Sequence, residues 1–282
     1  DTVQGVLAAR IDRLSPVERD VLCHAAVIGR TFWPGAVASM LPDMSRVDLL
    51  GVLRALQAKD FIVPARMTGE SPADGEPRFI FKHVLIRDVA YDLLPRARRA
   101  HEHERLALWL EDVAAGRTEE FADLLARHYE EYYRQAGLAR SRQRARRREV
   151  LAKVIGYLRV AGDLARQRSA SATAIRDYSR AIALLRESSG DDDPADRQQL
   201  IELLTARGDA RALHSDGDGA WKDYRAALRE WQRDASGQQR PPEEMARESA
   251  DERATGMRLY RWLVTLPARY PSWFRQPPSH DE

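Results

Sequence analysis

Two segments in the second half of the sequence repeat the same spacing of apolar and small residues. In each copy a leucine is followed four positions later by glycine, and then by alanine, tyrosine and alanine at fixed distances. The positions of the two copies are Leu158, Gly162, Ala174, Tyr178 and Ala181, and then Leu204, Gly208, Ala220, Tyr224 and Ala227. Glycine and alanine let two helices approach closely, and the tyrosine fills the remaining gap. The repeat therefore predicts helical pairs that bury their apolar faces against their neighbours.

The spacing is similar to that of tetratricopeptide repeats, with several departures. Arg186 and Gln232 stand where a helix-ending proline is usual, and Ala165 and Arg211 stand where the first helix usually has an aromatic residue. The two glycines lie 46 residues apart, rather than the roughly 34 of a regular repeat. We expect degenerate tetratricopeptide-like repeats within residues 112–266, with a surface that binds a protein or peptide partner.

The first hundred residues predict an N-terminal helix, then three short helices followed by two strands. Ser15 is a cap, Pro16 takes the first helical position, and Glu18 can close a capping box. Helices are expected over 3–14, 16–28, 34–41 and 46–59, and strands over 61–64 and 78–82, which pair as a hairpin. This order is typical of a winged helix-turn-helix. The fold class expected is mainly α: a winged-helix-like unit with a small β-hairpin, followed by a tetratricopeptide-like α-solenoid.

A winged helix can read DNA or serve as a packing module. The side chains that a recognition helix over 46–59 would offer are Arg46, Arg54, Gln57 and Lys59. Residues 1–100 hold 14 basic and 12 acidic side chains, an excess of only two. Because DNA binding calls for a stronger basic surface, we favour the packing module and keep a DNA-binding transcription regulator as the alternative.

Familiar catalytic motifs are missing from the sequence. No Gly-Lys dipeptide occurs, which excludes a phosphate-binding loop of the GxxxxGK[ST] type, and GxGxxG and GxSxG are also missing. In His101-Glu102-His103-Glu104, Arg105 takes the place of the second histidine of a zinc-protease motif. Histidines two apart on a helix point in different directions and cannot share a metal. We expect no catalytic residue, metal or cofactor in this chain, and interpret its histidines as surface or packing residues.

Composition constrains the class of protein further. The single cysteine, Cys23, excludes an internal disulfide framework. No run of about 18 apolar residues occurs, so no membrane segment is expected, and a cytoplasmic protein is favoured. Arginine outnumbers lysine 41 to 4, which we interpret as the codon bias of a GC-rich genome rather than as a need for arginine chemistry.

A series of short segments runs in order through the first half of the chain. They are Gln4-Gly5, Ala9 to Leu14, Ala25 to Arg30 with Phe32, Phe81 to His83, Ile86 to Tyr91, Leu94-Pro95 with Arg98-Arg99 and His103, Trp109 to Glu111, and Ala126 to Tyr129. In this order they resemble the region after the ATPase core of bacterial STAND-type regulators. Those proteins couple a P-loop ATPase to nucleotide-cyclase, LuxR-type or kinase output domains and to tetratricopeptide repeats. The resemblance implies a non-catalytic regulatory and scaffolding part of a signalling ATPase, whose ATP and Mg²⁺ site lies upstream of Asp1.

The resemblance also implies a contact surface, because in such proteins the winged-helix region packs on the nucleotide module. Candidates for facing that module are Arg10, Arg13, Lys82, His83 and Arg87. A purely structural interpretation stays open. In it, Arg10 and Arg13 pair with nearby carboxylates, while His83 and Arg87, four residues apart, occupy one face of a helix.

One run of the sequence is conspicuously basic. Its members are Arg140, Arg142, Arg144, Arg146, Arg147 and Arg148. The run is either a site for nucleic acid or an acidic partner, or a solvated loop and helix start; the lack of interleaved aromatic residues favours the second. Residues 137–168 carry 10 basic and 2 acidic side chains, whereas residues 187–218 carry 3 basic and 9 acidic ones. Two opposed charge patches are therefore expected on the repeat half.

The remaining expectations concern the division of the chain. Residues 1–111 are expected to form the regulatory unit, 112–266 the helical repeats, and 267–282 a proline-rich tail. Within the repeats, further helices are expected over 119–136 and 243–266. In the tail, Trp273 and Phe274 are either disordered or docked in a groove.

Overall fold

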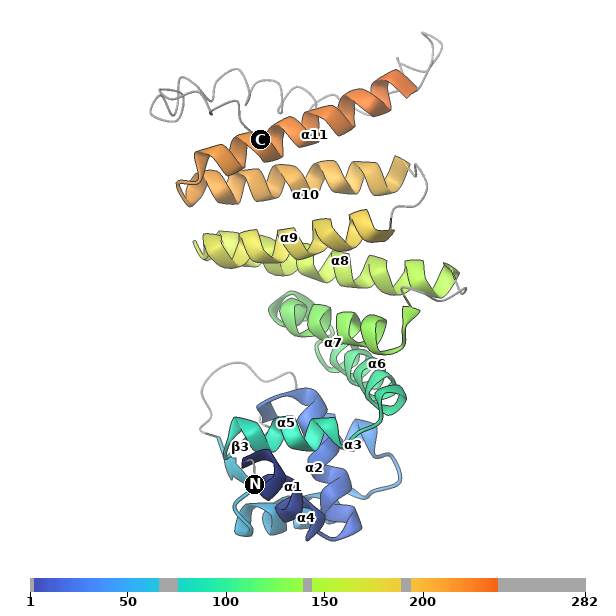
Figure 1. The fold of residues 1–282 in the computed structure, drawn as a ribbon, viewed down its shortest axis with the longest axis vertical. Helices are drawn as coiled ribbons and strands as arrows, with labels where there is room; N and C mark the ends of the chain where they lie inside the picture. Colours follow the sequence, from blue (N-terminus) through green and yellow to red (C-terminus); the bar gives the residue numbers. More distant parts are fainter. Residues whose placement is uncertain (1–2, 66–75, 139–143, 189–193, 238–282) are drawn as a thin grey trace. The chain divides into compact units, whose positions relative to one another are not determined.

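The computed structural model describes residues 3–65, 76–138, 144–188 and 194–237, and these residues are mostly helical (Figure 1). A mainly α fold is thereby confirmed. The chain divides into two compact units, Asp1–Val154 and Ile155–Glu282, and the division falls inside one helix, α8 (Arg144–Gln167). The boundary expected after residue 111 falls inside α6. Within the described ranges, no helix has both the length and the apolar character needed to cross a membrane.

The first unit consists of short helices around a small sheet. Its elements are α1 (Val3–Asp12), α2 (Pro16–Ile28), β1 (Thr31–Phe32), α3 (Pro34–Met40), α4 (Arg46–Ala58), β2 (Ile62–Pro64), β3 (Phe79–Phe81), α5 (Val84–Asp92), α6 (Arg96–Val113), the 3-10 turn η1 (Thr118–Phe121), α7 (Ala122–Gln135) and the start of α8. The helix α2 is central, because it packs against α3, α4, α5 and α6. Its residues from Val21 to Ile28 are all buried, as is usual for a helix covered on every side.

The start of α2 is the predicted capping box. Ser15 Oγ accepts a hydrogen bond from the Glu18 N–H at 3.3 Å, and a Glu18 carboxylate oxygen accepts one from the Ser15 N–H at 2.9 Å. Lys59 Nζ also donates to both carboxylate oxygens of Glu18, at 2.6 and 2.8 Å. The cap therefore fixes the start of α2 and also attaches to it the residue that ends α4.

The sheet has three strands instead of the two that were expected. The predicted hairpin is confirmed, since β2 pairs with β3 in antiparallel register with Ile62 opposite Phe81. The additional strand β1 pairs with the other edge of β3, and the order is β1-β3-β2. Two residues, Thr31 and Phe32, are too few to show alternation in the sequence. Phe32 is nevertheless fully buried, with its ring centroid 5.4 Å from that of Phe81.

Arginine side chains from distant elements bind the carbonyl groups at the end of α2. Arg87 Nε donates to the Ala26 carbonyl oxygen at 2.9 Å, and Arg127 Nη2 donates to the Ile28 carbonyl oxygen at 2.6 Å. The last carbonyls of a helix have no partner within the helix, and the helix dipole favours a cation beside them. These two contacts therefore anchor α5 and α7 to the end of the central helix.

The same contact recurs at other helix ends in the first unit. Arg105 donates to the carbonyls of Ser39 and Met40, Arg96 to those of Arg134 and Gln135, and Arg10 to that of Lys59. A guanidinium group reaches two neighbouring carbonyls at once, which an ammonium group does less well. The interpretation of the arginine excess as codon bias alone is therefore wrong for these positions, because arginine geometry is used there.

In its described part, the second unit holds the end of α8 and three further helices. These are α9 (Ser171–Ser188), α10 (Pro194–Leu213) and α11 (Gly217–Gly237). They lie as successive layers in Figure 1, with α10 packed against both α9 and α11. The helix expected over 243–266 and the tail with Trp273 and Phe274 lie outside the described residues.

The two sequence repeats make the same contacts in the second unit. Tyr178 and Tyr224 are fully buried, and each ring lies where a side chain on the repeat glycine would be, since a Cβ added to Gly162 or Gly208 would meet ring carbon Cε1 at 2.6 or 2.7 Å. Each tyrosine hydroxyl also donates to the aspartate after that glycine, Asp163 or Asp209, at 2.7 Å. The leucine and alanine positions of both repeats are buried as well.

In the second sequence repeat, the arginine at the position where an aromatic residue was expected has its own partners. Arg211 donates to the Asp223 carboxylate at 2.9 Å and to the Gly219 carbonyl at 3.1 Å. Arg207 binds the same carboxylate at 2.6 and 2.8 Å. Asp223 is almost fully buried, so the two guanidinium groups compensate its charge and join α10 to α11.

The close approach of Gly208 to Tyr224 gives a direct test of the repeat packing. Gly208→Ala should lower the free energy of unfolding by about 1–3 kcal/mol, because the added methyl group overlaps the ring. In the same unit, Gly156 lies in α8 with open space around it, so Gly156→Ala should raise stability by up to about 1 kcal/mol through helix propensity. Urea titrations followed by circular dichroism would compare the stabilities of the two variants. Equal effects of the two substitutions would contradict the close packing of Tyr224 on Gly208.

The arginine contacts with helix ends predict a cost for a charge-conserving change. Arg96→Lys should destabilise the first unit by about 1 kcal/mol, because lysine cannot serve the carbonyls of Arg134 and Gln135 together. Arg54 is exposed on α4, and Arg54→Lys is the matched control. Hydrogen exchange at the C-terminal end of α7 should accelerate in Arg96→Lys alone, and the same rate in both variants would argue against the cap.

Candidate functional site

Three of the five residues expected to face a neighbouring module gather around Asp60, in the turn between α4 and β2. Lys82 Nζ lies 2.7 Å from the Asp60 carboxylate. This hydrogen bond is the main cause that lowers the pKa of Asp60, and the charges of Arg10 and His83 lower it further. The guanidinium of Arg10 also lies 5.0 Å from the ring centroid of Phe61. The cluster thus gives an exposed, mostly basic surface at the junction of α1, the turn and the start of α5.

The other two candidates lie elsewhere. Arg13 is exposed in the turn after α1. Arg87 is engaged within the unit, because it binds the Ala26 carbonyl, pairs with Asp88 at 3.1 Å and lies 4.7 Å from the ring centroid of Tyr91. The part that Arg87 plays in the structure is therefore to join α5 to α2.

The described part of the basic run is attached to α6 and α7. Arg146 pairs with Glu104 of α6 and with Glu149, and hydrogen bonds with Tyr132 and Glu149 raise its pKa. Arg147 Nε donates to the hydroxyl of Tyr133 at 3.3 Å. Arg148 is exposed, Arg144 is the first residue of α8, and Arg140 and Arg142 lie outside the described residues. Arg146 and Arg147 therefore fix the start of α8 against the helices before it.

A buried polar cluster joins α2 to α6. The imidazole of His24 is fully buried, with its Nδ1 2.7 Å from the Asp20 carbonyl oxygen and its Nε2 3.6 Å from the Glu102 carboxylate. Arg98 Nε donates to the same Glu102 carboxylate at 2.8 Å. Burial lowers the pKa of His24, but the contacts with Glu102 and Asp20 outweigh burial and leave it raised. For Glu102, burial raises the pKa, and the contacts with His24 and Arg98 leave it lowered.

A second buried polar chain joins α5, α6 and α7. His103 Nδ1 faces His128 Nδ1 at 2.9 Å, the Tyr91 hydroxyl lies 2.9 Å from His103 Nε2, and Arg127 Nη2 lies 3.4 Å from His128 Nε2. One proton assignment satisfies every contact. Arg127 donates to His128 Nε2, His128 Nδ1–H donates to His103 Nδ1, and His103 Nε2–H donates to the Tyr91 oxygen. In this assignment both imidazoles are neutral.

The surroundings of the two histidines hold them in that neutral form. Burial, together with the charges of Arg127, Arg87, Arg99 and Arg134, lowers the pKa of His103 to about 3. For His128, which is fully buried, burial lowers the pKa well below its usual value, and His103, Arg127 and Arg87 add to the effect. A proton on either ring would be a buried charge among arginines, which is strongly unfavourable.

Sequence reasoning interpreted these histidines only as surface or packing residues. The signal that could have identified one of them was the pattern of α7, in which His128 shares the apolar face of Leu125 and Tyr129. A histidine at such a position must find a polar partner once it is buried. The sequence does not mark His103 as that partner, because His103 is 25 residues away along the chain.

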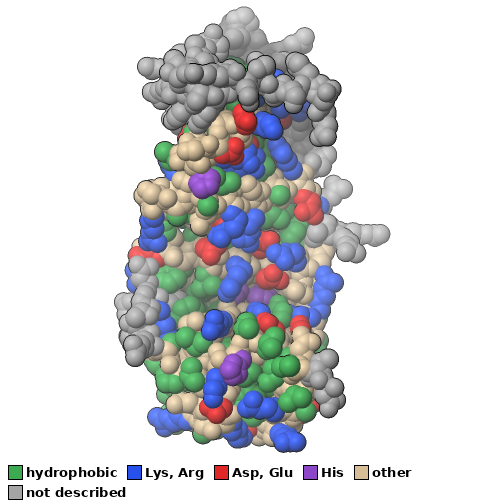
Figure 2. Space-filling view, turned by 60° about the vertical axis from the view of Figure 1, so that its left-hand side comes forward, with side chains coloured by type: hydrophobic (Ala, Val, Ile, Leu, Met, Phe, Trp, Pro, Cys, Tyr) green, Lys and Arg blue, Asp and Glu red, His purple; other side chains and the backbone are tan. Residues whose placement is uncertain are grey.

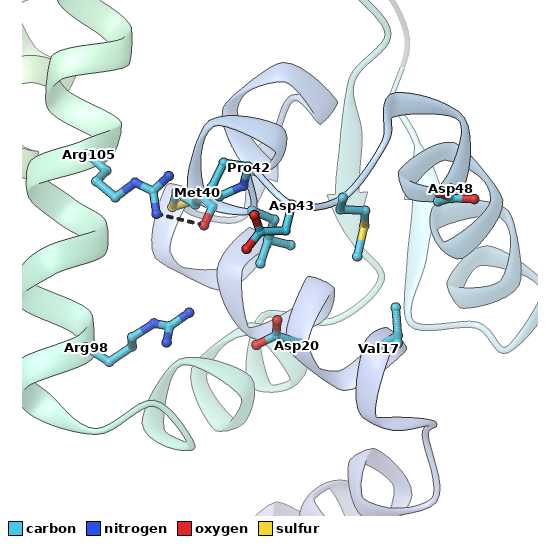
Figure 3. Close-up of a pocket in the computed structure, with 10 residues that line it drawn as sticks. Val17, Asp20, Met40, Pro42, Asp43, Asp48, Arg98 and Arg105 are labelled. Carbon is cyan, nitrogen blue, oxygen red and sulfur yellow. Dashed lines mark hydrogen bonds between the residues drawn. The ribbon is translucent and has the colours of Figure 1, made fainter.

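A pocket of about 560 Å³ lies beside the His24 cluster, between α2, the α3–α4 connection and α6 (Figure 3). Its lining residues are Val17, Asp20, Met40, Leu41, Pro42, Asp43, Met44, Asp48, Arg98 and Arg105. In Figure 3 the guanidinium groups of Arg98 and Arg105 extend from α6, and the carboxylates of Asp20 and Asp43 lie opposite them. The pocket therefore combines an apolar lining with charges of both signs.

Neither metals nor known relatives identify the site. Among the residues that the structure describes, no group of three or more histidine, cysteine, aspartate or glutamate side chains is arranged to hold a metal ion. No family model, no curated protein and no solved structure matches the chain.

The histidine chain predicts a loss of stability in acid. His103 and His128 have lowered pKa values in the folded state, so the unfolded chain takes up protons below about pH 6.5 while the folded chain does not. Each group then removes up to about 1.4 kcal/mol of stability per pH unit below that point. His24, with a raised pKa, acts in the opposite sense, because its contribution is present in acid and is lost as the pH rises.

Hydrogen exchange read out by peptide would follow the first unit separately. Between pH 7.5 and 5.5, after correction for intrinsic exchange, α6 and α7 should lose protection. The double variant His103→Gln with His128→Gln should show a flatter dependence, although it is less stable at neutral pH. Protection of α6 and α7 that rises on acidification in the parent chain would contradict the assignment of neutral imidazoles.

Proposed function

We propose that this chain is a non-catalytic regulatory and scaffolding part of a signalling ATPase. Its second unit binds a protein or peptide partner through tetratricopeptide-like repeats. Its first unit, a winged-helix-like module, relays that binding to an adjacent ATP-binding module with a nucleotide-cyclase or transcription-regulating output. The observation that carries the proposal is the repeated set of contacts in the second unit, in which Tyr178 packs on Gly162 and Tyr224 on Gly208.

The repeated contacts favour a stacked array, because they let each helix pair bury its apolar face against the next. Arg159 of α8 pairs with Glu202 of α10 at 2.7 Å, so the first helices of the two repeats are neighbours. Their outer faces carry charged side chains, and Leu213, at the end of α10, is 66% exposed. A surface that exposes both charged and apolar side chains is suited to binding a protein or peptide partner.

The first unit supports packing on a neighbouring module better than DNA readout. In α4, Arg46 lies 3.7 Å from the carboxylate of Glu76, and Lys59, which follows α4, is bound to Glu18. All four side chains named for base readout are exposed, but two of them, Arg46 and Lys59, already lie beside a carboxylate of this unit. On the face shown in Figure 2, basic side chains are spread among acidic and apolar ones rather than gathered in one basic surface. DNA binding depends on such a surface.

The relay is tested by reversing charge at exposed candidates that have no packing role. In the polypeptide that joins this chain to its ATP-binding module, the double variant Arg13→Glu with His83→Glu should change regulated ATP turnover several-fold, because two contacts become repulsive. The matched control is Arg54→Glu on α4, which should leave turnover unchanged. The same regulation in all three proteins would remove the relay from the proposal.

The DNA-binding alternative predicts a different result with the same chain. Fluorescence anisotropy with duplex DNA should show binding at low salt, and affinity should fall steeply as salt rises. Arg54→Glu should then weaken binding, whereas the relay proposal expects no such binding. A salt-dependent shift that Arg54→Glu removes would therefore favour the transcription-regulator alternative.

A further inference from the structure

We propose that the pocket between α2, the α3–α4 connection and α6 binds a small zwitterion of the α-amino-acid class with an apolar side chain. The proposal does not depend on the repeats or on the ATPase relay. It depends on the size of the pocket, on the two signs of charge that face each other across it, and on its apolar lining.

The size of the pocket suits a small molecule. Ligand sites usually range from about 300 to 1,000 Å³, are mostly apolar and contain a few converging polar groups. This pocket measures about 560 Å³. Met40, Leu41 and Met44 are among its apolar lining residues, and methionine side chains adapt readily to the shape of an apolar group. Met40 and Leu41 are buried behind the wall, and the accessible contact for an aliphatic or thioether side chain comes from Met44 and Val17.

The charges across the pocket are not paired with each other. Among the described residues, no ion pair of 4.0 Å or less joins Arg98 or Arg105 to Asp20 or Asp43. Within the described ranges Arg105 binds main-chain carbonyls, those of Ser39 and Met40, and no carboxylate there neutralises its charge. Opposite charges that face each other without contact leave room for a group that carries both signs.

The arrangement of charges in the pocket favours a zwitterion over a ligand that carries a single charge. A carboxylate would accept hydrogen bonds from the arginines on α6, as is common for this pair of groups. An ammonium group would lie toward Asp20 and Asp43 on the opposite side. An anion alone would face the aspartates and a cation alone the arginines, so each would meet a like charge that a zwitterion compensates. Asp48 already accepts a hydrogen bond from Ser45 Oγ at 2.6 Å and is not needed.

Binding of a ligand in the pocket would affect the buried His24–Glu102 pair, because Arg98 contacts both. Its guanidinium borders the pocket and also binds Glu102, the buried partner of His24. A carboxylate held by Arg98 would therefore limit the motion of α6 against α2. Ligand binding of this kind stabilises the folded state by mass action.

The test uses the full chain and isothermal titration calorimetry with the twenty standard amino acids as probes. An apolar amino acid such as leucine or methionine should bind, and its amide and N-acetyl derivatives should each bind about tenfold or more weakly, because each lacks one charge. No binding by any of the twenty at millimolar concentration would overturn the proposal. Equal binding of the amide or the N-acetyl form would overturn the assignment of a zwitterion.

Two variants and a control locate the site. Asp43→Asn removes an exposed charge with no packing role and should weaken binding about tenfold. Val17→Trp at the half-exposed rim should block the pocket sterically. Asp112→Asn, at an exposed aspartate elsewhere on α6, should leave binding unchanged. Binding that survives both pocket variants would place the ligand elsewhere and overturn the proposal.

Discussion

The first unit depends on contacts between arginine guanidinium groups and the carbonyl ends of helices. The central helix α2 ends at Ile28, whose carbonyl is bound by Arg127, two residues after the carbonyl bound by Arg87. Helix ends that pack inside a protein need partners for their carbonyls. Because these partners come from α5 and α7, the contacts that satisfy the end of α2 also determine where those helices lie.

The buried histidines follow from the same arrangement. Arg127 Nη2 binds the end of α2 and also lies within 3.4 Å of His128 Nε2, so the polar chain through His103 to Tyr91 continues a contact that the fold already needs. Its direction is set by the arginine, which can only donate. The neutral state of both rings is thus a consequence of having several fixed positive charges around one dry region. The contacts that pack α7 against the end of α2 are thus the same ones that hold the buried histidine chain.

Local sequence signals predicted local structure well. The capping box of α2, the hairpin of β2 and β3, and the glycine–tyrosine repeat all depend on residues whose spacing along the chain reflects their contact in space. The strand β1 was missed because two residues carry no alternation. The arginine contacts were missed because a main-chain carbonyl has no residue type that marks it. The pocket and the His103–His128 contact join elements far apart in sequence, which periodicity cannot reveal.

The glycine–tyrosine contact also has a consequence for how this region can change over evolutionary time. Each copy contains its own glycine, tyrosine and aspartate, so the contacts of one copy do not use these residues of the other. A copy could be duplicated or lost as a block without removing a contact inside the copies that remain. Within a copy the residues are coupled, because a side chain at the glycine position fits only if the tyrosine is also replaced by a smaller residue. The contacts among glycine, tyrosine and aspartate are therefore self-contained in each copy.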